Sequence, residues 1–273
     1  NGVSIDGQGG PDLFGYKWID SNDPNGPLYT WYNITSNPSA VQVVFTGGNL
    51  DDGSTGAIPI GFPFEYYGNL FTNLYICTNG FISFNALTSS YVTNIQIPSA
   101  SLPNNIIAPF WYDLDGRTHG KVHYLFENNK FYIQFTNWQK YNATGSLSFQ
   151  MVLYSDGRVM FYYNNMNATL TSATVGIENS AGTDGLQIAY NAAYVSNGLA
   201  VKISADPDWL TNNISGGTIF NGNFIDVVLT LSSEDYPLGT YTMDLVINSN
   251  DLVNPTITIP VIMEIANIFE LTS

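Results

Sequence analysis

The sequence predicts an all-β protein of the sandwich or jelly-roll type, and three observations support this class. Short segments alternate apolar and polar residues with a period of two, and none shows the sustained spacing of an amphipathic helix. Turn formers punctuate these segments, with 25 Gly and 13 Pro among 273 residues. Charged residues make up only 11% of the chain, against about 25% in ordinary globular proteins. Together with 18 Tyr and 16 Phe, this balance is typical of β-sandwiches found outside cells.

The clearest elements are two β-hairpins, whose turns lie at Asn128-Asn129 and Asp156-Gly157. Asp-Gly tolerates positive φ at both central positions, so the second turn is predicted to be type I′. Regularly spaced short strands imply a sandwich or a jelly roll. The expected strands cover residues 41–45, 73–77, 80–84, 122–126, 131–135, 149–154, 159–163, 173–177, 186–190 and 199–203.

The spacing of the predicted strands changes near residues 204–207, and we place a domain boundary there. We expect an N-terminal arm (1–10), a jelly-roll-like sandwich (11–204), a smaller sandwich (205–266) and an apolar C-terminal tail (267–273). The smaller domain offers only four or five strands, whereas an immunoglobulin sandwich has about seven strands in ~100 residues. We therefore expect it to be incomplete by itself.

The net charge of −15, with only 7 Lys and Arg, argues against two classes of partner. Nucleic-acid binding depends on basic side chains that neutralise phosphates, and anionic lipid surfaces require the same residues. No stretch approaches the ~20 apolar residues of a membrane span. We expect no nucleic-acid partner and no membrane insertion. The chain begins at Asn1 without a signal region, so an exported protein is present as a mature form or a fragment.

Residues suited to catalysis are scarce. Cys77 lies in an apolar run and, as the single cysteine, is expected to be a small buried hydrophobe. His119 and His123 would lie about 13 Å apart on a strand and lack the glutamate of an HExxH site. There is no G-x-S-x-G elbow, and no pair of carboxylates stands out for glycoside cleavage. We expect no enzyme activity, no catalytic residue and no cofactor.

Acidic turns leave structural calcium as one open interpretation. Asp113-Leu114-Asp115-Gly116 is similar to a fragment of a calcium loop, and Asp51-Asp52, Asp20 and Asp23 are further acidic turns. Calcium needs six or more oxygen ligands, and only pairs are visible here. Asp also forms turns through side-chain bonds to the backbone, and this is the preferred interpretation.

Aromatic residues allow a different kind of site, a platform on which sugar rings stack. Consecutive strand residues face opposite sides, so at least one ring of Tyr162-Tyr163 should face outward. The competing and preferred interpretation is that these rings fill the core and its rim. The candidate platform residues are Tyr66, Tyr67, Trp111, Tyr112, Trp138, Tyr141, Tyr162 and Tyr163.

Both ends of the chain are apolar where solvated residues are usual. Val3 and Ile5 alternate like a short strand, and Ile268, Phe269 and Leu271 follow the last expected strand. An extended apolar segment can add as a strand to an open sheet edge. The alternatives are that each end packs on its own domain or is a simple linker.

Several short stretches between roughly residues 10 and 203 form a familiar set: residues 10–16, 18–27, 51–53, 60–64, 67–68, 78–82, 108–111, 156–157 and 175–179. Together they resemble a β-sandwich module of bacterial secreted proteins. The resemblance implies a secreted protein that leaves by the type IX route, as proteases, adhesins and large surface proteins with this module do. The family's sorting and protease domains are absent, so the route is inferred only and no activity carries over.

The second domain has marks of its own at residues 208–210, 216–218, 239–241, 247–251 and 255–261. These stretches resemble the short immunoglobulin-like repeat that follows this module. The resemblance implies a jelly-roll-like sandwich followed by a small immunoglobulin-like sandwich.

Four Asn-x-Ser/Thr sequons make Asn33, Asn142, Asn167 and Asn213 candidates for N-glycosylation. Sequons also arise by chance in an Asn-rich chain, and many bacteria lack the glycosylation machinery.

Two functions follow from these observations. The preferred one is a non-enzymatic structural or adhesive protein on the bacterial cell surface, a fimbria-like filament subunit whose partners are other copies of itself. Ile268, Phe269 and Leu271 offer a donor strand more apolar area than Val3 and Ile5 do, at about 1.5–3 kcal/mol for each buried side chain. The alternative is a carbohydrate-binding or accessory module of a larger secreted protein, with glycans as partners.

Overall fold

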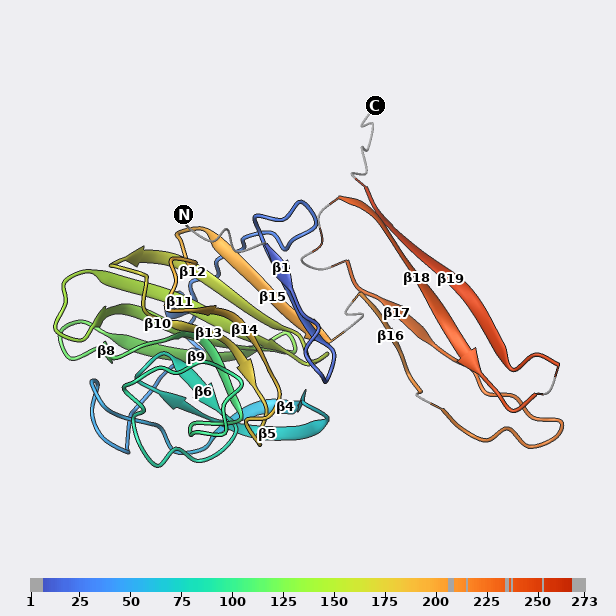
Figure 1. Ribbon diagram of the computed structural model, residues 1–273, viewed down its shortest axis with the longest axis horizontal. Helices are drawn as coiled ribbons and strands as arrows, with labels where there is room; N and C mark the ends of the chain where they lie inside the picture. The colour runs from blue at the N-terminus through green and yellow to red at the C-terminus, as the bar shows by residue number, and fades with distance from the viewer. Residues whose placement is uncertain are drawn as a thin grey trace. The chain divides into compact units, whose positions relative to one another are not determined.

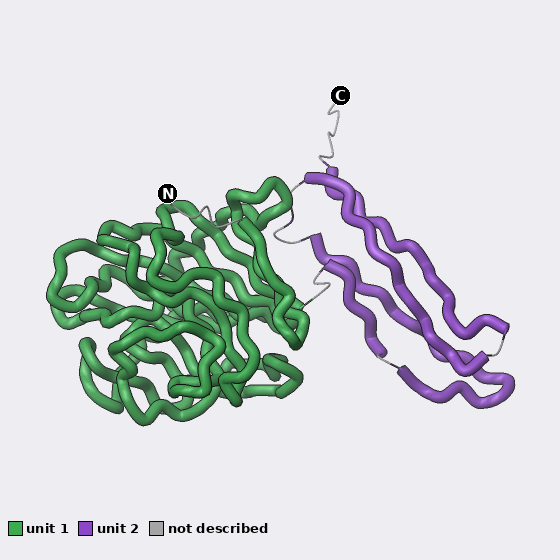
Figure 2. Tube along the Cα trace, in the orientation of Figure 1, with its two compact units in different colours: residues 1–206 green, residues 207–273 purple. Residues whose placement is uncertain are grey.

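The computed structural model describes residues 7–205, 209–214, 216–233, 236, 238–251 and 253–266. The chain divides into two compact units, residues 1–206 and 207–273 (Figure 2). The described secondary structure consists of β-strands and one short 3₁₀ helix, η1 (Ile34–Ser36). The predicted all-β class is confirmed.

Two antiparallel sheets build the first unit (Figure 1). The larger sheet has the order β1-β2-β15-β12-β11-β10-β9-β3, with β8 paired to β10, and the smaller has the order β14-β13-β7-β6-β5-β4. The strands are β1 (Gln8–Gly9), β2 (Tyr16–Asp20), β3 (Val41–Gln42), β4 (Ile58–Tyr66), β5 (Asn69–Cys77), β6 (Phe81–Ser83), β7 (Ile106–Trp111), β8 (Leu114–Asp115), β9 (Lys121–Glu127), β10 (Lys130–Lys140), β11 (Ser146–Tyr154), β12 (Val159–Asn167), β13 (Thr174–Glu178), β14 (Gly185–Tyr190) and β15 (Leu199–Ala205).

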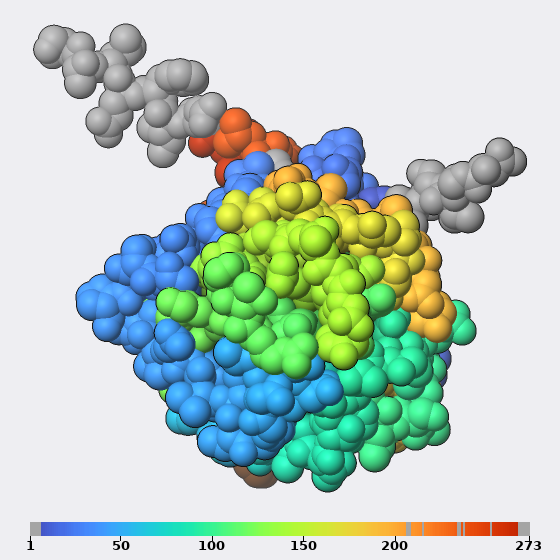
Figure 3. All heavy atoms as spheres, turned by 90° about the vertical axis from the view of Figure 1, so that its left-hand side faces the viewer, coloured from blue at the N-terminus to red at the C-terminus, as the bar shows by residue number. Residues whose placement is uncertain are grey.

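The inner faces of the two sheets enclose the main core. Alternate residues of the larger sheet, such as Phe149 and Met151, meet residues of the smaller sheet such as Ile76 and Ile107, and all are fully buried. The ring of Phe149 stacks on that of Phe135 with centroids 4.7 Å apart. Figure 3 shows the closed surface around this core, where early (blue) and middle (green to yellow) parts of the chain lie side by side.

The outer face of the larger sheet is also covered, by residues 29–36, which we call the covering segment. Tyr29 and Trp31 pack on an apolar cluster that includes Tyr154 and Tyr162. Tyr163 points into the main core, and Tyr162 points outward as expected. Tyr162 is nevertheless only 2% exposed, because the covering segment lies over it.

Two buried glutamines fasten the covering segment to the sheet. The side-chain oxygen of Gln134 accepts from the backbone N–H of Ile34 at 3.1 Å. The side-chain nitrogen of Gln150 donates to the backbone oxygen of Tyr32 at 2.8 Å and to Gln134 at 3.1 Å. The backbone of the segment therefore finds its partners in side chains, since it forms no strand pairing with the sheet below.

The two predicted hairpins form, but the turn of the second differs from the predicted type. Asn128 and Asn129 both have positive φ, 52° and 59°, as a type I′ turn requires. At the second hairpin only Gly157 has positive φ, 92°, so the predicted type I′ turn at Asp156-Gly157 is wrong. The N–H of Tyr154 bonds the oxygen of Arg158, which closes a three-residue loop with glycine in the left-handed position.

The alternation pattern did not predict the two-residue strands β1 and β8 or three longer ones, β2, β4 and β7. Proline is normally confined to edge strands and irregular positions. Pro59 and Pro63 in β4 and Pro109 in β7 therefore argued against strands at these positions. β4 is an edge strand of the smaller sheet, where its prolines are tolerated. β7 lies inside that sheet, and its pairing with β13 shifts register between Thr174 and Gly176, close to Pro109.

The second unit contains two separate strand pairs (Figure 1). β16 (Leu210–Asn212) pairs with β17 (Leu229–Leu231), and β18 (Gly239–Asn248) pairs with β19 (Thr256–Ile265). Its described core holds only Trp209, Leu210 and Met263 as buried residues. The core is therefore small for two ten-residue strands.

We expect Gln134→Ala to loosen the covering segment. The substitution removes the acceptor of the Ile34 N–H and one of the two acceptors of the Gln150 amide, which keeps its bond to Tyr32, at a cost of about 1–3 kcal/mol in unfolding free energy. Denaturant unfolding, with hydrogen exchange at Ile34, measures both effects. Gln139→Ala is the control, because its amide makes one long contact of 3.4 Å with the Gly145 oxygen. Equal stability of the two variants would contradict this account.

Candidate functional site

The groups that most often carry catalysis are scattered in this fold. Cys77 is buried, and burial raises the pKa of its thiol to about 12, so the thiol stays protonated and unreactive. His119 is exposed in a loop, whereas His123 is half-buried in β9, where burial followed by Lys121 lowers its pKa. Among the described residues, no group of three or more His, Cys, Asp or Glu could hold a metal ion.

Glu178 is an acid whose pKa lies near neutrality. Its side chain is fully buried at the end of β13, and burial raises its pKa to about 7, although the backbone N–H of Ser99 donates to one carboxylate oxygen. The other oxygen, Oε2, is buried and bonds to none of the residues that the structure describes. Such a pKa suits a general acid, but a carboxyl with no solvent-exposed surface cannot reach a substrate. Sequence reasoning assigned Glu178 no role, because burial of this group has no local signal.

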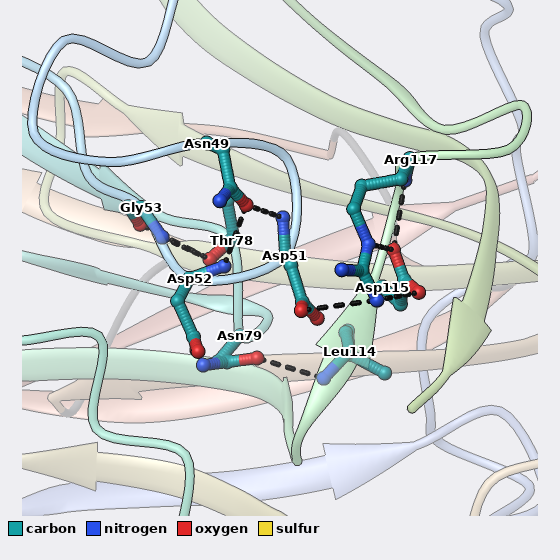
Figure 4. A network of polar contacts seen from close by, with 9 residues as sticks. All are labelled: Asn49, Asp51, Asp52, Gly53, Thr78, Asn79, Leu114, Asp115 and Arg117. Carbon is teal, nitrogen blue, oxygen red and sulfur yellow. Dashed lines mark hydrogen bonds and ion pairs between the residues drawn. The ribbon is translucent and has the colours of Figure 1, made fainter. Parts of the chain in front are cut away.

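Three turns meet in a polar network around the acidic residues that the sequence singled out (Figure 4). The backbone N–H of Gly116 donates to the oxygen of Leu50 at 2.7 Å, and so ties two acidic turns together. Asn79, in a third turn, accepts from the N–H of Leu114 at 2.7 Å. The structure therefore brings together Asp51-Asp52 and Asp113–Asp115, which lie some sixty residues apart in the sequence.

Arg117 neutralises part of this acidic network. Its Nε and Nη2 contact the two carboxylate oxygens of Asp115 at 3.0 and 2.8 Å, and Nη2 also lies 3.1 Å from Oδ2 of Asp51. The hydrogen bond from Arg117 lowers the pKa of Asp115. Burial, followed by the charge of Asp115, raises the pKa of Asp51, and burial with repulsion from Asp52 raises that of Asp113.

The geometry gives the acidic turns a structural role. Oδ1 of Asp51 is buried and bonds no described residue, while Arg117 lies where a cation would balance Asp51 and Asp115. Asp20 and Asp23 act as turn formers, since each accepts the N–H of the residue two positions later. Structural calcium remains a prediction.

The aromatic residues proposed as a sugar platform are mostly inside the protein. Tyr66, Trp111, Trp138, Tyr162 and Tyr163 are at most 2% exposed. Tyr141 is 42% exposed, and Tyr67 and Tyr112 are half-buried. A stacking platform needs several exposed rings, so this burial counts against the carbohydrate-binding alternative.

The four sequon asparagines lie at the surface. Asn33 caps η1 and accepts from Gln134 at 3.0 Å, Asn142 lies in a turn with φ of 53°, and Asn167 ends β12. Asn213 is exposed in the second unit, and Ser215 of its sequon lies outside the described residues. Glycosylation at these positions stays a prediction.

The assembly candidates Val3, Ile5, Ile268, Phe269 and Leu271 all lie outside the described residues. The second unit nevertheless offers a surface suited to receive an apolar strand. One face of the β18–β19 hairpin is apolar, and near its base Met263 is only 7% exposed. Toward the loop, four apolar side chains lie outside the core, and we call them the tip face: Leu245, Ile247, Ile257 and Ile259.

The second unit exposes apolar side chains at the tip face and in the β16–β17 connection. Ile257 and Ile259 are 49% and 43% exposed, and Phe220 and Phe224 in the β16–β17 connection are 72% and 80% exposed. A soluble domain seldom leaves this much apolar area in water unless it binds a partner. The fold and this surface therefore define an all-β protein with a covered sandwich and a second, partly uncovered unit.

The chain belongs to the NIDO-related family, whose model matches residues 28–213. Among curated proteins it is similar to alpha-tectorin, with 26% identity to that of Mus musculus, 25% to Homo sapiens and 26% to Gallus gallus, in each case over 211 residues. These alignments cover 65% of this chain and 9% of the alpha-tectorin chain, so the chain spans less than a tenth of those relatives. No solved structure matches.

Export by the type IX route and a bacterial cell surface remain predictions, because neither the family nor alpha-tectorin bears on them. In the described part of the chain, no helix is long and apolar enough to cross a membrane.

Stability should fall as pH rises through the range in which Glu178 ionises. The folded pKa of about 7 lies above the usual value of 4.5. The free-energy cost of ionising Glu178 in the folded protein is therefore absent below pH 4.5 and grows between pH 4.5 and 7. It reaches on the order of 3 kcal/mol above that range. Glu178→Gln should remove this penalty. Thermal or denaturant unfolding of both proteins across pH 4–8 gives the difference curve, with Glu65→Gln controlling for loss of one charge. A flat difference for Glu178→Gln would contradict the burial argument.

Replacing Arg117 by Gln should destabilise the protein at neutral pH and much less in acid. A carboxyl whose folded pKa is lowered adds stability at neutral pH, and this contribution is lost as pH falls and Asp115 becomes protonated. The Arg117 side chain is 52% exposed, so added salt should shrink the effect. Melting temperatures at several pH values and salt concentrations test this, with Lys121→Gln removing the same charge from β9. A pH-independent loss would show that Arg117 acts by packing instead.

Proposed function

We propose that this protein is an extracellular, non-enzymatic structural protein whose copies assemble head to tail by β-strand donation. The observation that carries the proposal is the uncovered apolar surface of the second unit, above all the tip face. Alpha-tectorin, to which most of the chain is similar, is an extracellular matrix protein, and this supports a structural role outside cells. The scarcity of accessible catalytic groups supports the non-enzymatic part of the proposal.

The donor in this proposal is the apolar tail, residues 267–273, of another copy. Phe269 and Leu271 are two residues apart, so both point to one face of an extended strand, while Glu270 points to the other. Burying the two apolar side chains against the tip face contributes about 1.5–3 kcal/mol each. Backbone pairing at a sheet edge adds specificity for an extended segment.

Donation of this kind joins unlike surfaces, a tail on one copy and a hairpin on the next. Such head-to-tail contacts do not close unless the rotation returns to its start, so repetition produces a fibre. The partners are therefore other copies of the same chain. A bacterial cell surface, where a fimbria-like filament would stand, is the setting that the sequence resemblance implies.

Deleting residues 267–273 should abolish assembly of the full chain. Sedimentation velocity and negative-stain electron microscopy, at moderate salt, should show fibres for the wild type and single copies for the deletion. The double substitution Phe269→Asn/Leu271→Asn should behave like the deletion, because it keeps the tail but removes its apolar face. Near-ultraviolet circular dichroism checks that the first unit is still folded.

Val3→Asn/Ile5→Asn is the matched control at the other end, and it should assemble like the wild type. Loss of fibres in this variant, with assembly unchanged in the deletion, would assign the donor to the N-terminus and overturn the C-terminal assignment. Wild-type protein that stays as single copies up to high concentration would overturn self-assembly altogether.

A further inference from the structure

We infer that the donated strand is accepted by the outer edge of β18, and not by that of β19. This inference rests on the proposed strand donation and names the acceptor. β18 and β19 pair in ten consecutive antiparallel pairs without a register shift, from Gly239–Ile265 to Asn248–Thr256. Each strand of this hairpin has one edge toward its partner and one outer edge, and no other described strand pairs with either outer edge.

Pro260 fixes which backbone groups face outward. In an antiparallel ladder, residue pairs alternate between those that exchange two hydrogen bonds and those that exchange none. Proline has no N–H, so the Asp244–Pro260 pair belongs to the set without bonds, and the backbone polar groups of both residues point away from the partner strand. By the same alternation, the outward-pointing residues of β18 are Thr240, Thr242, Asp244, Val246 and Asn248.

The two outer edges therefore differ in what they offer an added strand. The outer edge of β19 has Pro260 at its centre, where it lacks a donor and its ring obstructs pairing. β18 has no proline from residue 239 to 248, so its outer edge keeps every N–H and C=O. Proline on an edge strand is a common device against strand addition, and it leaves β18 as the open edge.

The apolar side chains of β18 match the pattern of the tail. A strand beside β18 lies next to Leu245 and Ile247, which occupy one face of the hairpin and belong to the tip face. Phe269 and Leu271 would extend that apolar face. Ile268 and Glu270 would lie on the opposite face, where β18 presents threonines, Asp244 and Val246.

The proposal takes the donor from another copy, as head-to-tail assembly requires. β19 ends where β18 begins, because Gly239 pairs with Ile265, so a tail that returned along the outer edge of β18 in its own copy would run parallel to β18. Pairing of a tail within its own copy would give single copies in sedimentation velocity, whereas donation to a neighbour gives fibres.

Proline substitution at matched edge positions tests the inference. Thr242→Pro and Thr258→Pro replace the same residue type at outward-pointing positions of β18 and β19, so neither removes a hydrogen bond within the hairpin. We expect Thr242→Pro to weaken self-association of the full chain by about tenfold or more, because it removes a donor and places a ring in the pairing edge. Thr258→Pro should associate like the wild type. Sedimentation velocity over a concentration series measures both.

Hydrogen exchange of the wild type provides a second measurement that needs no proline variant. Peptides from residues 239–248 should gain protection in fibres relative to the tail deletion, and peptides from 256–265 should not. Association lost in Thr258→Pro but kept in Thr242→Pro, or protection gained only in 256–265, would overturn the β18 assignment and leave strand donation standing. Assembly unchanged by the tail deletion would instead overturn the proposed function itself.

Discussion

A β-sheet in water needs an apolar face that is covered and edges that are protected, and the two units of this chain meet this requirement to different degrees. In the first unit, the larger sheet is covered by the smaller sheet on one side and by residues 29–36 on the other. One edge of the smaller sheet, β4, carries Pro59 and Pro63. In the second unit, two strand pairs cover each other only at one end.

A shortage of cations shapes the polar structure of the first unit. With 7 Lys and Arg against 22 Asp and Glu, most acids need partners other than basic side chains. Asp12 accepts the N–H groups of Gly15 and Tyr16, and Asp184 accepts those of Leu13 and Phe14. These carboxylates stabilise turns by bonding backbone donors. In sequence, the acidic turns therefore resemble fragments of calcium sites. Carboxylate oxygens can bond backbone N–H groups in a turn or coordinate a cation, and the sequence pattern is the same in both cases.

Much of the fold could be predicted from local pattern, and the exceptions have identifiable causes. The alternation around Asn128-Asn129 predicted the β9–β10 hairpin, because register and turn are set within a dozen residues. The turn at Asp156-Gly157 was predicted with the wrong geometry, because Tyr154 bonds to Arg158 and Ser155 thereby becomes a third residue of the loop. The outward direction of Tyr162 was correct, but its burial depends on a segment over a hundred residues earlier.

The candidate site shows the same division between local and long-range information. The acidic pairs at 51–52 and 113–115 were visible in the sequence, whereas their meeting around Arg117 depends on the sheet topology. The burial of Glu178 likewise depends on Ser99, in a loop that packs on β13 from elsewhere in the chain. The apolar surface of the second unit was predictable in part, since its strands were predicted but the exposure of their apolar side chains was not.

The family match and the uncovered apolar surface of the second unit lie in different parts of the chain. The NIDO-related match ends at residue 213, so it covers most of the first unit and stops before β17, β18 and β19. The proposed assembly therefore rests on the β18–β19 hairpin and not on the family match. Along one face of that hairpin, exposure rises from 7% at Met263 to 49% at Ile257 while the residues stay apolar. Apolar side chains at the exposed end gain their burial free energy only when something covers them. An added strand at β18 would cover them and pair the one hairpin edge without proline.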